Sequence, residues 1–157
     1  MPEVMCLGIL VADVLARPVD EFPERGRLML VDRMELHAGG CAGNTAIGLA
    51  RIGVSAGVIG RVGDDGFGDF LVSVMRREGV EADGIARDQS ANTSGTMVMV
   101  HGDGERSFIH YLGANGELVA EDVDLDRLAG AKVLHVAGSL LMPKFDGEPT
   151  AQVLREA

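Results

Sequence analysis

The chain has 157 residues, of which 46% are hydrophobic and 24% are charged, so disorder is excluded as its dominant state. Acidic side chains exceed basic ones and give a net charge of −10, the wrong sign for a nucleic-acid partner. No apolar run approaches the roughly 18 residues of a membrane helix, and Met1-Pro2-Glu3 lacks the basic start of a signal peptide. Two cysteines, Cys6 and Cys41, form neither a disulfide framework nor a metal motif, so the cytoplasm is the simplest expected location.

The chain alternates between apolar runs typical of strands in a parallel sheet and amphipathic segments typical of helices. Strands are expected over residues 4–11, 54–62 and 132–137, and helices over 45–52, 65–79, 125–128 and from 149 to the last residue. Gly53 and Gly79 stand where helices should end, and Asp65 stands where it can cap the second helix. The order predicts an α/β fold, a Rossmann-like and mainly parallel sheet flanked by helices.

Two further segments do not fit this alternation and are placed together in a small accessory sheet. Residues 28–36 are extended in character, with one face open. Asp103-Gly104 lies between two β-rich runs, which is a strong hairpin signal. In the second of these runs Phe108 and His110 share a face that is suited to covering a ligand. The alternative is a hairpin packed on its own domain or on a second subunit.

Glycine, with 22 residues, is the unusual feature of the composition. The sequence GGCAGNTA at 39–46 lets backbone N–H groups approach a ligand at a helix start. It has no P-loop lysine and no G-x-G-x-x-G pattern, so backbone donors and the Asn44 amide suit a neutral polyol. Asp13 follows the first strand, where a carboxylate can accept sugar hydroxyls. A tight strand–helix connection at 39–46 and a capping or solvated Asp13 are the alternatives without a ligand.

Other conspicuous residues are interpreted as structural. The segment GRVGDDGFG at 60–68 is expected to make a tight turn, a cap and a close helix–sheet contact. None of the isolated histidines, His37, His101 and His135, is assigned a proton-transfer role. Gly113-Ala114-Asn115 is either a return to the main sheet or a simple turn.

Together these pieces resemble the PfkB/ribokinase family of carbohydrate kinases. The resemblance rests on Asp13, on Gly39-Gly40-x-x-x-Asn44, on the glycine motif at 60–68 and on the hairpin leading to 113–115, in matching order over the whole chain. It implies a ribokinase-like fold with a small β-sheet lid, formed here by about residues 14–37 and 95–111. It also implies phosphorylation of a sugar or nucleoside hydroxyl with ATP and Mg²⁺.

By the same resemblance, Asp13, Gly39, Gly40 and Asn44 bind the acceptor sugar, with Phe108 and His110 as weaker candidates. The catalytic base of the family is an Asp in a Gly-Ala-Gly-Asp-like motif, which does not occur in these residues. Residues 1–157 are therefore expected to be the N-terminal, acceptor-binding part of the domain, without its ATP-binding half and inactive alone. No metal ligands are assigned within them.

The identity of the acceptor and the role of the chain are left open by the sequence. Ribokinases proper tend to have Asn where Val11 stands and Lys where Cys41 stands, which argues against ribose. Fructose, a keto-deoxy sugar acid, a nucleoside and another sugar remain alternatives. The alternative to a kinase is a non-catalytic sugar-binding or dimerisation module, and a nicotinamide-binding domain fits poorly. A homodimer formed through the lid is a further hypothesis, because a small isolated sheet exposes a face and an edge.

Overall fold

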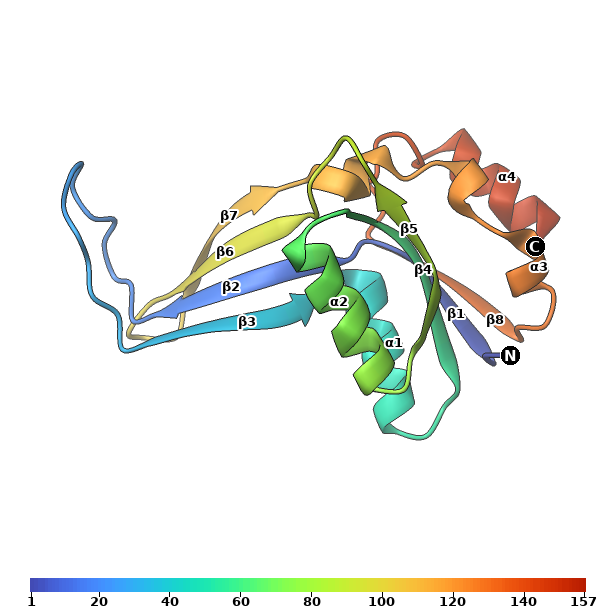
Figure 1. Ribbon diagram of the computed structural model, residues 1–157, viewed down its shortest axis with the longest axis horizontal. Coiled ribbons are helices and arrows are strands. Elements are labelled where there is room, and N and C mark those ends of the chain that lie inside the picture. The colour runs from blue at the N-terminus through green and yellow to red at the C-terminus, as the bar shows by residue number, and fades with distance from the viewer.

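Four parallel strands form the central sheet, sheet A, of the computed structural model, which describes residues 1–157 (Figure 1). Their order is β5-β4-β1-β8, with bounds β1 Val4–Gly8, β4 Ala56–Gly63, β5 Glu81–Asp88 and β8 Val133–Ala137. The predicted parallel sheet is confirmed, but the sequence analysis missed β5. That strand reads EADGIARD and has neither a continuous nor an alternating apolar pattern.

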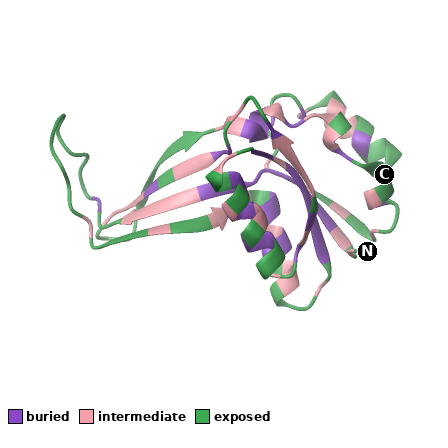
Figure 2. Ribbon diagram, viewed as in Figure 1, coloured by how far each residue is buried: buried purple, intermediate pink, exposed green.

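Helices cover both faces of sheet A (Figure 1). The helices α1 Cys41–Arg51 and α2 Gly66–Arg77 lie on one face, and η1 Gly113–Glu117, η2 Ala120–Asp122, α3 Leu125–Leu128 and α4 Glu148–Glu156 follow on the other side. Successive residues of β1 alternate between two apolar cores, with Cys6 in the first and Leu7 in the second. This double burial explains the apolar run at the start of the chain, and Figure 2 shows the buried residues along these strands.

The accessory sheet, sheet B, projects away from sheet A and its helices (Figure 1). Its order is β3-β2-β6-β7, with bounds β2 Val11–Arg17, β3 Arg33–Gly39, β6 Gly95–Val100 and β7 Arg106–Tyr111. The β6–β7 hairpin is confirmed as antiparallel, and β2 pairs with β6 in parallel and with β3 antiparallel. Most of sheet B is exposed or half-buried (Figure 2), unlike the interior of sheet A.

The expected strand over residues 4–11 was wrong at its end. The strand stops at Gly8, and the chain then enters sheet B. The φ of Gly8 is 146°, a backbone conformation that residues with a Cβ atom rarely adopt. Asp13 therefore lies inside strand β2 rather than in a loop after a strand of sheet A. The apolar run continues through this break, which is why the sequence pattern hides it.

Several other expected boundaries also differ. The strand expected over 28–36 begins at Arg33, and Leu28 and Leu30 are exposed in the preceding loop. The first helix begins at Cys41 rather than at residue 45, because the end of the glycine-rich turn forms its first helical turn. Strand β8 was expected to be buried but is largely exposed, since it lies at the edge of sheet A. Gly53 and Gly79 end their helices in left-handed conformations, as predicted.

Candidate functional site

Four polar side chains form a row across sheet B, one from each strand. The strand registers pair His37 with Asp13, Asp13 with Thr96, and Thr96 with His110. Directly paired residues project from the same face of a sheet, and the Thr96 Oγ1 and His110 Nδ1 atoms lie 3.0 Å apart. Two predicted site residues, Asp13 and His110, thus meet in one row although 97 positions separate them in sequence.

His37 and Thr96 belong to this row but were not identified from the sequence. His37 was interpreted as an isolated structural histidine, and Thr96 only as the start of a β-rich run. The sequence did contain one indication: His37 lies two residues before Gly39, and residues two apart in a strand share a face of the sheet. Recognising it required knowing that β3 pairs with β2, which the sequence did not reveal.

The environment of Asp13 suits a carboxylate that accepts hydrogen bonds. Its partial burial raises the pKa of the carboxyl group, while the neighbouring Thr96 hydroxyl and the His110 and His37 rings oppose this shift. Partial burial also strengthens any hydrogen bond that the carboxylate accepts, because less water competes for it. The side chain can hold two hydroxyl donors through its two oxygen atoms.

Gly39 and Gly40 bring the backbone close to Asp13 and to the start of α1. A Cβ atom on residue 39 would lie 2.9 Å from Asp13 Cγ, and nearer still to its Oδ2 atom, so only glycine leaves this carboxylate in place. Gly40 has a φ of 86°, and a Cβ there would lie 2.8 Å from the Leu10 Cα atom. Gly40 carries no capping side chain, so the first N–H groups of α1 are left for another partner.

Asn44 lies on α1, one turn from Gly40, whose carbonyl oxygen accepts the Asn44 backbone N–H at 2.9 Å. The residue is exposed, and its side chain makes no hydrogen bond within the chain. The structure thus unites Asp13, Gly39, Gly40 and His110 through register and contact. No hydrogen bond joins the Asn44 amide to Asp13, so their convergence stays a prediction.

Phe108 shares the face of His110 but lies one row further from the glycine turn, opposite Val98. It is 57% exposed, and the Arg106 guanidinium carbon lies 5.8 Å from the centre of its ring. An exposed ring of this kind offers an apolar surface to the C–H face of a sugar. The geometry places Phe108 beside the polar row rather than in it.

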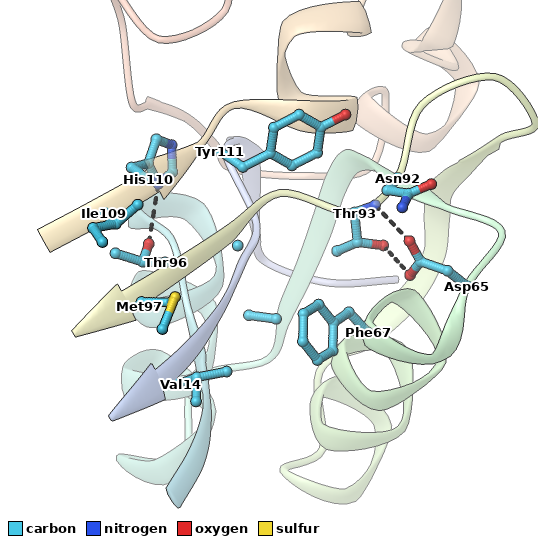
Figure 3. Close-up of a pocket in the computed structure, with 12 residues that line it drawn as sticks. Val14, Asp65, Phe67, Asn92, Thr93, Thr96, Met97, Ile109, His110 and Tyr111 are labelled. Carbon is cyan, nitrogen blue, oxygen red and sulfur yellow. Dashed lines mark hydrogen bonds between the residues drawn. The ribbon is translucent and has the colours of Figure 1, made fainter. Parts of the chain in front are cut away.

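A cavity of about 490 Å³ lies mainly against the opposite, apolar face of sheet B (Figure 3). Its apolar lining comes from sheet B and the first turn of α2, and includes Ala12, Val14, Phe67, Met97, Ile109 and Tyr111. Thr96 and His110 also border it, but Asp13, Gly39, Gly40 and Asn44 do not. Of the predicted sugar-binding residues, only His110 therefore borders this cavity.

The glycine motif at 60–68 has the structural role expected from the sequence. The Asp65 carboxylate accepts the Gly68 N–H at 2.9 Å and caps α2. The same carboxylate accepts the backbone N–H and the hydroxyl of Thr93, both at 2.7 Å (Figure 3). These bonds, which lower the pKa of Asp65 against the opposing effect of burial, tie the start of α2 to the segment that leads into β6.

The family is established by comparison with known proteins. The family model described as pfkB family carbohydrate kinase matches residues 1–157, so the chain belongs to the pfkB family. A probable chloroplastic fructokinase-6 from Arabidopsis thaliana is 32% identical over 138 residues, covering 85% of this chain and 34% of that protein. The ATP-bound fructokinase structure from Xylella fastidiosa is 31% identical, with a TM-score of 0.71 over 87% of this chain and 42% of that one.

The Giardia lamblia ribokinase structure supports the fold alone, at 22% identity, with a TM-score of 0.82 over 99% of this chain and 47% of that chain. The fold is thus confirmed as ribokinase-like. The chain spans less than half the length of these relatives. No group of three or more His, Cys, Asp or Glu side chains is placed to hold a metal ion. None of the helices has the length and apolarity needed to cross a bilayer.

Proposed function

We propose that the protein carrying this chain transfers a phosphoryl group from ATP to a hydroxyl of a sugar or related polyol. Residues 1–157 supply the acceptor-binding surface. The observation that carries this proposal is the polar row of sheet B, whose Asp13 carboxylate lies directly against Gly39. Membership of a carbohydrate kinase family and the fructokinase relatives support it, and make D-fructose the first acceptor to test.

In this proposal Asp13 accepts hydrogen bonds from acceptor hydroxyls and fixes their orientation. The free N–H groups at the start of α1 donate to acceptor oxygens beside Gly40, and Asn44 adds an amide able to donate and accept. His110 and Phe108 extend the same surface from β7. Phosphoryl transfer depends mainly on such positioning.

Sheet B acts in the proposal as a lid over the acceptor, with its segments at about 14–37 and 95–111. Excluding water matters because hydrolysis of ATP competes with transfer to a sugar. ATP and Mg²⁺ are expected as co-substrate and cofactor, since solved relatives hold ATP, and one holds ATP with Mg²⁺. Residues 1–157 contain no group of three or more His, Cys, Asp or Glu side chains placed to hold that metal. Two free cysteines suit a reducing compartment such as the cytoplasm.

The test is a coupled assay of the protein with ATP, Mg²⁺ and a panel containing D-fructose, D-ribose, a keto-deoxy sugar acid and a nucleoside. Turnover of one acceptor, with its KM raised at least about tenfold by Asp13→Ala, supports the proposal. Sugar binding without turnover would favour the non-catalytic module instead. Turnover with an unchanged acceptor KM in Asp13→Ala would remove the role assigned to Asp13.

We also propose that the apolar face of sheet B pairs with the same face of a second copy. Met97 and Tyr111 on this face are 55% and 54% exposed. Met97 pairs with Ile109 on one side and with Val14 on the other, and Val14 pairs with Leu36. An exposed apolar patch of this kind marks a protein–protein interaction site, because burying it against a partner is favourable. Met97→Asp should give a monomer by analytical ultracentrifugation, whereas Leu154→Asp on α4 should not. A dimer that persists in Met97→Asp would contradict this interface.

A further inference from the structure

Asn115 uses both ends of its side-chain amide on one distant residue. Its Oδ1 atom accepts the Leu10 N–H at 3.0 Å, and its Nδ2 atom donates to the Leu10 carbonyl oxygen at 2.9 Å. Asn115 is 1% exposed, and Leu10 lies between β1 and β2, outside both sheets. A side chain must carry a donor and an acceptor to satisfy both backbone groups, and an amide does so.

Leu10 is the point at which the chain passes from sheet A into sheet B, three residues before Asp13. The same segment is packed on another side against Gly40, since a Cβ at that position would lie 2.8 Å from Leu10 Cα. The segment that leads to Asp13 is thus held between Asn115 and the start of α1. A shift of Leu10 would move Asp13 relative to the glycine turn.

Asn115 is itself tied to a second crossing between the sheets. The N–H of the preceding Ala114 donates to the Asn92 carbonyl oxygen at 2.9 Å, shortly before β6 begins. Two residues further on, the Ser94 carbonyl oxygen accepts the Ala12 N–H at 2.9 Å. The entries into β2 and β6, which carry two members of the polar row, are therefore joined through one small cluster of hydrogen bonds.

We infer that Asn115 is a positioning residue of the acceptor site: its amide clamps Leu10 and so sets where the Asp13 carboxylate lies beside Gly39. The inference rests on the proposed function for the role of Asp13. The amide acts through the backbone, at a distance from the acceptor.

The test compares Asn115→Ser, whose hydroxyl cannot reach both groups of Leu10, with Asn115→Leu, which removes both bonds. In either variant we expect the calorimetric Kd for D-fructose to rise at least about tenfold, while the KM for ATP changes less than about twofold. Hydrogen exchange at the Ala12 and Asp13 amides should accelerate at least about tenfold, because that segment is released. If Asn115→Leu does not fold, Asn115→Ser decides.

The matched control is Thr150→Val, which removes a hydrogen bond from Thr150 Oγ1 to the Phe145 carbonyl oxygen at 2.6 Å, far from sheet B. It should lower the Tm without changing fructose affinity or exchange at Asp13. A folded Asn115→Ser variant with an unchanged Kd for D-fructose would overturn the inference. If the unsubstituted protein binds no sugar, the proposed function fails, and unchanged exchange at Ala12 and Asp13 would then overturn the clamp separately.

Discussion

Replacing Gly39 with Ala tests whether the position of the Asp13 carboxylate determines acceptor binding. The added Cβ would lie 2.9 Å from Asp13 Cγ, whereas two carbon atoms in contact prefer about 3.5–4.0 Å. The carboxylate must therefore move by about 1 Å, and a short side chain can do so by rotating about χ1. We expect this to cost folding about 1 kcal/mol or less, because a displaced rotamer costs little.

The same displacement should affect binding much more strongly. Hydrogen bonds to a charged group contribute about 1.5–3 kcal/mol, so misplacing the acceptor carboxylate should weaken sugar binding roughly 10- to 100-fold. Calorimetry with D-fructose measures this loss, and thermal unfolding measures the folding cost. Gly48→Ala is the matched control, since its Cβ meets nothing within 4 Å in α1 and should stabilise the helix by about 1 kcal/mol. Gly39→Ala with unaltered acceptor affinity would refute the reasoning.

Three further substitutions have expected outcomes. Gly40→Ala should destabilise the protein by at least about 2 kcal/mol in urea unfolding. Residue 40 has a left-handed backbone conformation, and its added Cβ would collide with backbone atoms of neighbouring residues. A smaller loss of stability would contradict this prediction. Burial raises the pKa of Asp13, so ionisation of this carboxyl group lowers the stability of the fold as pH rises. Asp13→Asn should therefore raise the Tm at pH 7 and weaken acceptor binding. A lower Tm in Asp13→Asn would contradict this prediction. Backbone N–H groups and Arg61 hold the pKa of Asp88 well below its usual range. Asp88→Asn should therefore lower the free energy of unfolding by about 3 kcal/mol at pH 7, and by progressively less below pH 4. An equal loss of unfolding free energy at pH 3 and pH 7 would contradict this prediction.

Local patterns in the sequence were sufficient to predict most helices, the hairpin and the parallel sheet. Apolar periodicity, the left-handed glycines 53 and 79 and the Asp65 cap act within a few residues, so each can be recognised without knowing its neighbours in space. The family motifs likewise predicted that Asp13, Gly39 and Gly40 belong to one acceptor site, and that assignment stays a prediction. The structure shows that Gly39 lies against the Asp13 carboxylate.

The break after Gly8, the strand β5 and the row of His37, Asp13, Thr96 and His110 were decided only by tertiary structure. Their partners lie tens of residues away, and the pairing register that joins them leaves no local signal in the chain. A strand such as β5 forms because sheet A offers its backbone hydrogen bonds and α2 covers it, despite its weak apolar pattern. The amide of Asn115 shows the same limit, since its two bonds to Leu10 span 105 positions of sequence.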